Sequence, residues 1–464
     1  MKIDTSVTPK DLLPRVNELF ELSGTKILAI DRRWKPESGT PVFTVKGKYT
    51  TRGWTEWTQG FRFGSALLQF DAGEDEQFLD RGIQGTLQSM ATHVSHIGVH
   101  DHGFNNISTY GNLLRLYREG KAPRDSWAEA FCELALKVSG AVQAARWTAL
   151  PDNLGYIYSF NGPHSLFVDT IRSLRVLSAA HALGHVLMGE QDRKISLLER
   201  MLQHAEATAR YNIFFGDGRD IYDIRGRAVH EAVFNVTNGI FRCPSTQQGY
   251  SPFSTWTRGQ AWALAGYPEQ LEYLETLSKD SFSQAQVAEL EGKESFINRF
   301  LETSRALGDF YIDQTPADGI PYWDTGAPGL ADLAGWRDRP ADPYNDYEPV
   351  DSSAAAIAAQ GLLRLGRYLQ EKGEKSEGGR YFQAGLTVAS TLFSEPYLCT
   401  DPQAEGLILH SVYHRPNGWD YIPEGRKVPC GEATMWGDYH ARELALYIKK
   451  IAEGGPYYTF WNYL

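Results

Sequence analysis

The chain has 464 residues, of which 42% are hydrophobic, and its 46 basic and 57 acidic side chains give a formal net charge of −11. This composition is typical of a globular protein with one large domain or two to three ordinary ones. The negative charge argues against a nucleic-acid partner and against binding to an anionic membrane surface. An anionic substrate would therefore have to be held by local hydrogen-bond donors.

The cysteines are scattered without a close pair, which excludes a zinc ribbon and a redox CxxC motif and suits a reducing compartment. The N-terminal residues lack an apolar stretch after Lys2, and no run of 18 apolar residues occurs. We expect a cytoplasmic protein, with a periplasmic location left open if a native leader is missing from the sequence. The cysteines are Cys132, Cys243, Cys399 and Cys430.

The dominant pattern along the chain is that of amphipathic helices separated by Gly, Pro and Asn. Two segments predict short strands instead: residues 41–46 alternate in polarity, and residues 229–240 are typical of a hairpin closed by Asn238-Gly239. In chain order, the predicted helices cover residues 9–22, 57–72, 76–97, 106–119, 125–147, 165–187, 192–211, 256–276, 283–312, 352–371, 376–394 and 434–453.

About twelve helices would form six helical hairpins, and no repeat of fixed period indicates an open solenoid. We therefore predict an all-α fold, an (α/α)6 barrel with short β segments in its connecting loops. No Pro/Gly/Ser-rich linker divides the chain, so residues 1–464 should form a single domain, as a monomer or a homodimer. The mouth of the barrel would be lined by polar, aromatic-rich connectors at residues 100–112, 153–165, 213–256, 313–351 and 395–434.

A histidine cluster surrounds the first candidate carboxylate, Asp101. One interpretation places His93, His96 and His100 on one face of a helix, where they could bind a transition metal, although further ligands at suitable spacing are missing. A second makes Asp101 a site carboxylate at the end of a helix, with His100 and His102 as neighbours. A third is a polar helix end without a function.

The second candidate carboxylate, Asp169, interrupts an otherwise apolar helix pattern that includes Leu166 and Ile171. An aspartate on an inward face is costly unless it is paired or functional. Burial raises a carboxyl pKa, as a general acid at neutral pH requires. Two carboxylates from different helices, Asp101 and Asp169, are typical of a glycosidase. A helix cap or a salt bridge to Arg172 remains an alternative.

The segment from Gln248 to Trp262 combines amides, indoles and one permanent cation, Arg258. Indole faces stack on sugar rings, and amides and a guanidinium bind hydroxyls and carboxylates. This mixture predicts the wall of a site for an anionic sugar. The alternative is a helix start with Ser254 as N-cap and with Trp256 and Trp262 buried.

Taken together, these segments resemble the unsaturated glucuronyl hydrolases, glycoside hydrolase family 88. The motifs follow in order over some 400 residues, and the stretch that ends at Trp262 is the most specific. The matching segments are Trp57–Phe61 with Gly64, His100–Phe104, Asp169, His204-Ala205, Gln248-Gly249, Ser254–Trp262, Asp351–Ala355 and Gly437–Tyr439.

The resemblance implies an (α/α)6 barrel and hydration of a 4,5-unsaturated uronic acid, which polysaccharide lyases leave at the non-reducing end of oligosaccharides. Asp169 would be the acid and base, and Asp101 would position the sugar and influence the pKa of Asp169. The partner would be a small unsaturated di- to tetrasaccharide, and no metal or organic cofactor is implied. The expected substrate-binding residues are His100, Phe104, Trp57, Phe160, His204, His230, Gln248, Arg258 and Trp262.

The chain departs from the family pattern in three places. Arg62-Phe63 follows the early motif, and Phe160 stands where many members have a tryptophan. The stretch 216–228 is longer and more charged than in the family. Its arginines, Arg219, Arg225 and Arg227, would either recognise a sulfate or a second uronate or be solvated.

Three other functions remain open. Unsaturated rhamnogalacturonyl hydrolases share the fold and chemistry, although the motif versions here favour the glucuronyl type. Sugar 2-epimerases also use an (α/α)6 barrel, with paired histidines in place of an aspartate pair. A helical binding or scaffold protein would show no turnover at all.

Overall fold

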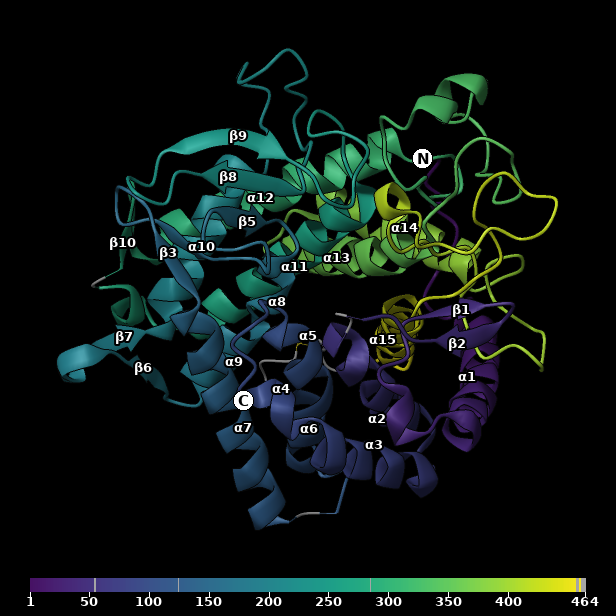
Figure 1. Cartoon of the computed structure of the whole chain (residues 1–464), viewed down its shortest axis with the longest axis horizontal. Coiled ribbons are helices and arrows are strands. Elements are labelled where there is room, and N and C mark those ends of the chain that lie inside the picture. Colours follow the sequence, from purple (N-terminus) through teal and green to yellow (C-terminus); the bar gives the residue numbers. More distant parts are fainter. Residues whose placement is uncertain (54–55, 124, 284, 456–458, 460–464) are drawn as a thin grey trace.

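The computed structural model describes residues 1–53, 56–123, 125–283, 285–455 and 459. Within these ranges the main helices alternate along the chain between an outer and an inner ring, six in each (Figure 1). Each inner helix contacts the next, and the last inner helix packs against the first, so that the inner ring is closed. The predicted (α/α)6 barrel is confirmed.

The inner ring is buried almost throughout, because its helices are covered by the outer ring on one side and by each other. Small residues allow this packing: the Ser- and Ala-rich first half of α13 is fully buried against α11. The inner helices are α2 (Gln59–Gly73), α5 (His102–Asn106) continuing through the π-helical turn Ile107–Gly111 into α6 (Asn112–Arg118), α8 (Thr170–Ser173) with α9 (Arg175–Ala182), α11 (Thr257–Thr276), α13 (Ser352–Glu371) and α15 (Met435–Ala452).

The outer helices are amphipathic and bury one face against the inner ring. Side-chain caps start several of them: Asp75, Asp125 and Ser196 accept backbone N–H groups at the first turns of α3, α7 and α10. The outer helices are α1 (Leu13–Arg33), α3 (Glu76–Ser89), α7 (Ser126–Ala145), α10 (Leu197–Tyr211), α12 (Gly292–Gln314) and α14 (Lys375–Leu392), and the short α4 (Ala91–Val94) follows α3.

The strands are short and antiparallel and lie in the connections between helices. The largest sheet has the order β5-β8-β9 and pairs Phe167 with Glu231, so it joins the segment before α8 to the segment before α11. The strands are β1 (Phe43–Val45), β2 (Lys48–Thr50), β3 (Trp147–Ala149), β4 (Gly155–Ile157), β5 (Ser165–Phe167), β6 (Val186–Met188), β7 (Lys194–Ser196), β8 (Glu231–Phe234), β9 (Phe241–Ser245), β10 (Gln286–Val287) and β11 (Leu290–Glu291).

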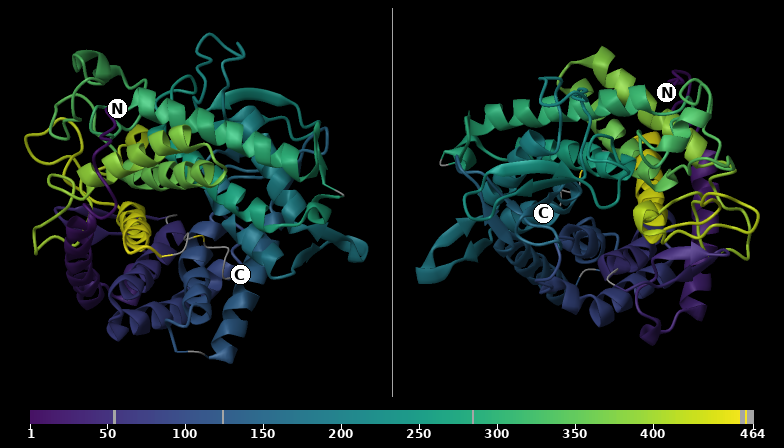
Figure 2. Two further views of the ribbon diagram at one scale, coloured as in Figure 1. Left: turned by 180° about the vertical axis from the view of Figure 1, so that it is seen from behind. Right: turned by 45° about the horizontal axis from the view of Figure 1, so that its top comes forward.

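All six connections that lead from an outer helix to the next inner helix are long, and they gather over one end of the barrel (Figure 2). The inner helices therefore all begin at this end, where their N-termini favour negative charge. The motif residues identified in the sequence stand at these helix starts. They are Trp57 before α2, Asp101 before α5, Asp169 before α8, Arg258 in α11, Asp351 before α13 and Trp436 in α15.

The predicted helix 165–187 is wrong at both ends. Residues 165–167 form strand β5, and Asp169 lies in the turn that follows it, directly before α8. The apolar pattern arises because Leu166 and Phe167 are buried as a strand beside β8, and a short apolar run does not distinguish a strand from a helix.

Other boundaries also differ from the predicted ones. The helix predicted at 9–22 occupies 13–33, since Gly24 packs against the Phe78 ring and does not end it. Residues 194–196, 286–287 and 290–291 form strands before their helices. Residues 76–97 divide into α3 and α4, and the connector 100–112 is largely helical. None of the described helices combines the length and apolar composition needed to cross a bilayer.

The contact between α11 and α13 leads to a stability prediction. A Cβ atom on Gly361 would lie 2.2 Å from the Leu264 carbonyl oxygen, whereas Gly379 on α14 has no neighbour within 4 Å of the same position. Gly361→Ala should lower the free energy of unfolding by about 1–3 kcal/mol because two inner helices must separate. Gly379→Ala should raise it by about 0.5–1 kcal/mol. Urea unfolding followed by circular dichroism measures both, and equal effects would contradict this account of the packing.

Candidate active site

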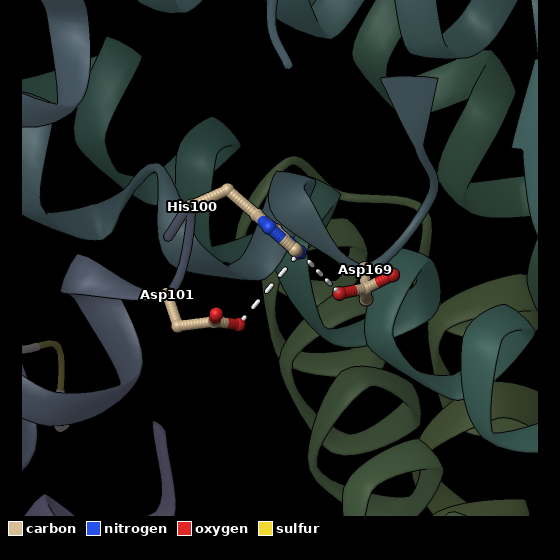
Figure 3. A group of neighbouring side chains, drawn as sticks. All are labelled: His100, Asp101 and Asp169. Carbon is tan, nitrogen blue, oxygen red and sulfur yellow. Dashed lines mark hydrogen bonds and ion pairs between the residues drawn. The ribbon is translucent and has the colours of Figure 1, made fainter. Parts of the chain in front are cut away.

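Two carboxylates and one imidazole meet at the centre of the barrel mouth (Figure 3). The His100 Nε2 atom lies 3.2 Å from Asp169 Oδ2 and 3.7 Å from Asp101 Oδ1, and all three side chains are buried. Asp101 directly precedes α5 and Asp169 directly precedes α8, so each carboxylate stands at the start of an inner helix. Asp101 was expected at the end of a helix, and this placement is wrong, because the segment before it is a loop.

The His100 imidazole makes the pKa values of the two carboxylates shift in opposite directions. Burial opposes the charged form of His100, but Asp101 and Asp169 outweigh burial and raise its pKa. Burial raises the pKa of Asp101. Burial acts in the same direction on Asp169, but the hydrogen bond and the charge of His100 outweigh burial and lower the pKa of Asp169. The expectation of a raised pKa at Asp169 is therefore wrong, because His100 outweighs the effect of burial.

Two further histidines approach this group as neutral donors. The backbone N–H of Ile157 donates to His204 Nδ1 at 3.0 Å, and that of Gln247 donates to His230 Nδ1 at 2.9 Å. Each Nδ1 must then carry the lone pair, which places the hydrogen on Nε2. Burial lowers the pKa of His204 to about 3 and that of His230 to about 4. Neither Nε2 atom has a hydrogen-bond partner among the described residues, and His230 Nε2 lies 3.7 Å from Asp169 Oδ1.

The other histidines of the cluster are not arranged on one helix face as metal binding would require. Helix α4 ends at Val94, so His93, His96 and His100 do not share a helix face, and that alternative is wrong. His102 contacts Ser139 Oγ through Nδ1 and the His96 carbonyl through Nε2. Among the described residues, the group with ligand atoms close enough to share a metal ion is His100, Asp101 and Asp169, all within 4.8 Å. This group is the acidic centre itself.

Aromatic residues from opposite sides of the ring form the floor and one wall of the site. Trp57 stacks on Trp436 with ring centroids 5.0 Å apart, and Phe104 packs on Trp262 at 4.7 Å. Phe104 and Trp262 are buried, whereas Phe160 is 54% exposed.

Arg258, the permanent cation of the segment that ends at Trp262, is already hydrogen-bonded within the protein. Arg258 donates to Asp351 Oδ2, to Gln248 Oε1 and to the carbonyl oxygens of Val412 and Tyr413. Asp351 in turn caps α13, so one guanidinium ties α11, α13 and the loop before α15 together. Because Gln248 uses its oxygen for Arg258, its NH2 group is the part left for a ligand. Sugar contact by Arg258 itself stays a prediction.

No protein-family model matches the chain. An unsaturated glucuronyl hydrolase of Bacillus sp. strain GL1 is 25% identical over 412 residues, which span 88% of this chain and 90% of that protein. One of Formosa agariphila is 24% identical over 392 residues, or 84% of this chain and 78% of that protein. Over most of its length the chain is similar to unsaturated glucuronyl hydrolases.

The barrel fold of this family is also seen in solved structures. An unsaturated glucuronyl hydrolase specific for heparin superimposes with a TM-score of 0.70 at 20% identity, covering 96% of this chain and all of that one. The hydrolase of Bacillus sp. GL1 superimposes with a TM-score of 0.67 at 22% identity, covering 96% and 98%. At these identities the likeness establishes the fold alone.

In the charged stretch 216–228, the three arginines all have partners within the protein. Arg219 donates to the carbonyl oxygens of Tyr211 and Ile213, Arg225 pairs with Asp309 on α12, and Arg227 pairs with Asp220. The three arginines thus hold the loop to itself and to the outer ring. Sulfate recognition by these arginines stays a prediction.

Several residues around the site were not predicted as site residues. Tyr413 and Trp436 lie far along the chain from Trp57, yet Tyr413 Oη accepts the Trp57 Nε1 hydrogen at 3.4 Å. Nothing in the sequence around Tyr413 indicates this contact. For Trp436 the signal was its place after the helix cap Thr434 and before a family landmark.

The raised pKa of His100 can be tested by NMR. In protein with 13C-labelled histidine, the His100 resonance, assigned with His100→Gln, should titrate above the ordinary value of about 6.5. Asp101→Asn should lower this pKa, because the carboxylate charge that favours the imidazolium is removed. Asp313→Asn, on an exposed position of α12, is the matched control and should leave the titration unchanged. A His100 pKa below 6.5 in the unaltered protein would contradict the assignment of charge.

Proposed function

We propose that this protein releases a 4,5-unsaturated glucuronic acid from the non-reducing end of small oligosaccharides by hydrating the C4=C5 bond. The observation that carries the proposal is the pair of buried carboxylates, Asp101 and Asp169, that share His100 at the start of two inner helices. Relatives over most of the chain are named unsaturated glucuronyl hydrolase, and one of Streptococcus agalactiae is named unsaturated chondroitin disaccharide hydrolase.

The resting site holds Asp169 ionised and His100 protonated, so the acid must first be formed. The bound uronate brings a second negative charge and displaces water, and both effects favour a neutral carboxyl at Asp169. His100 then transfers its Nε2 proton along the 3.2 Å hydrogen bond to Asp169 Oδ2. Asp101 Oδ1 lies 3.7 Å from His100 Nε2, and its negative charge favours the protonated imidazole before the transfer.

In the chemical step, Asp169 gives one proton to the substrate and takes one proton from water. Asp169 delivers its proton to C4, and the electrons of the double bond form the new C4–H bond, which leaves positive charge shared by C5 and the ring oxygen. Ionised Asp169 accepts a proton from water as the water oxygen bonds to C5. The resulting hemiketal opens, and the glycosidic bond is lost as the sugar rearranges.

Neutral groups are suited to hold the uronate. The Nε2–H groups of His204 and His230 and the NH2 group of Gln248 are donors, and the inner-helix N-termini add positive potential. Phe160 offers an exposed ring face. None of these contacts requires a free arginine or lysine, which fits a chain with a net charge of −11.

The reaction can be followed by the ultraviolet absorbance of the conjugated double bond in lyase-generated disaccharides. The absorbance should fall on addition of the protein, with a chelator present, because the proposed step destroys the C=C–carboxylate chromophore without a free metal. An unchanged absorbance across glucuronyl substrates would contradict the proposal. Loss only from rhamnogalacturonan fragments would favour the related hydrolase class.

Asp169→Asn should lower kcat by about 10²–10⁴-fold, as loss of a general acid does. Binding of the disaccharide, measured by calorimetry, should be retained because the carboxylate acts in the transition state. Asp313→Asn is the matched control and should keep full turnover. Retained turnover in Asp169→Asn would remove Asp169 from this role.

A thioglycoside substrate tests the order of bond breaking. Hydration at C4 and C5 does not protonate the glycosidic atom, and sulfur is a weak hydrogen-bond acceptor. We therefore expect the thioglycoside to lose its ultraviolet absorbance at a rate within about tenfold of the oxygen glycoside, since both share the same C4 protonation. Complete resistance of the thioglycoside would indicate ordinary glycoside hydrolysis.

A further inference from the structure

A buried carboxylate without a cationic partner lies beside the catalytic group. Glu231 follows His230 on β8 and is 2% exposed. It accepts hydrogen bonds from Ser165 Oγ at 2.5 Å and from Asn161 Nδ2 and Gln247 Nε2 at 3.1 Å each. Among the described residues, no salt bridge joins it to a lysine or an arginine, so neutral donors alone stabilise this charge.

Glu231 is ionised in this environment. Burial opposes ionisation, but the hydrogen bonds from Ser165, Gln247 and Asn161 outweigh burial and lower its pKa. Arg146, whose guanidinium reaches the Ser159 carbonyl, donates to the carbonyl oxygens of Ile97, Tyr158 and Ser159 and forms no salt bridge with Glu231. The negative charge therefore remains uncompensated at this side of the site.

The carboxylate also fixes how two amides face the mouth. A carboxylate only accepts hydrogen bonds, so Asn161 and Gln247 must turn their NH2 groups toward Glu231. Their carbonyl oxygens are thereby turned away from it. Asn161 is partly exposed and Gln247 is exposed, so a ligand can reach both amides.

These amides frame the approach to the reacting group. Asn161 adjoins Phe160, whose ring stacks on the His100 imidazole at 5.9 Å with an interplanar angle of 26°. Gln247 donates its backbone N–H to His230, which faces Asp169. Glu231 bridges the two segments, so an aromatic face, two amide acceptors and one negative charge surround the same entrance.

We propose that Phe160, Asn161 and Gln247, held by Glu231, bind the sugar next to the unsaturated uronate and select an uncharged sugar over a sulfated one. The inference rests on the proposed function. The ring of Phe160 would stack on the sugar, and the amide oxygens would accept hydrogen bonds from hydroxyl or acetamido N–H groups. A sulfate has no donor for these oxygens and would be repelled by Glu231.

The test compares kcat/KM for one unsaturated disaccharide with and without a sulfate on the second sugar. The unaltered protein should prefer the unsulfated form by roughly tenfold, the size expected for like charges near a protein surface. Gln247→Lys places a cation beside Glu231 at an exposed position, where folding is not at risk. It should raise kcat/KM for the sulfated sugar about tenfold and lower the unsulfated value, because lysine lacks the amide oxygen that would accept from that sugar.

Two further variants complete the design. Glu231→Gln removes the charge and should also shift the preference toward the sulfated sugar. Gln403→Lys makes the same change as Gln247→Lys in an exposed loop before α15 and should leave the ratio unchanged.

The outcomes separate the inference from the proposed function. An unaltered protein that turns over the sulfated sugar equally well or better, or a ratio that Gln247→Lys leaves unchanged, overturns the inference alone. Loss of the double bond from neither disaccharide overturns the proposed function and the inference with it.

Discussion

The closed inner ring is the constraint on which the rest of the structure depends. Because each inner helix packs against two others and begins at the same end, six helix N-termini meet at one mouth. Residues that are far apart in the chain, such as Trp57 and Trp436, become neighbours only through this closure. The long outer-to-inner connections are left over the mouth, where their side chains determine what can enter.

Within the mouth, the His100 imidazole sets the chemistry of two carboxylates that are equally buried. Its Nε2 atom hydrogen-bonds Asp169 and lies slightly farther from Asp101, and this difference lowers one carboxyl pKa while burial raises the other. The site is therefore poised with an ionised base and a nearby proton, and a bound uronate would redistribute that proton. The positions of the carboxylates alone would not have distinguished their roles.

Cations in this protein serve mainly to hold its parts together. Arg258 fastens two inner helices to the loop before α15, and Arg227 fastens the charged loop to itself. In the proposed function, recognition of the anionic sugar draws on neutral histidine and amide donors and on the helix N-termini. Near the second sugar, the uncompensated charge of Glu231 would make binding of a further negative group unfavourable.

The amino-acid sequence by itself determined the helical barrel and the segments that carry the site, because amphipathic periodicity and helix caps are local signals. It also indicated Asp101, Asp169 and the segment that ends at Trp262. The tertiary structure alone decided which groups face each other. The lowered pKa of Asp169 arises from His100, 69 residues earlier in the chain. The guanidinium of Arg258 is hydrogen-bonded by a loop more than 150 residues later. Protonation and hydrogen-bond partnership depend on distances of a few ångströms, which local patterns do not encode.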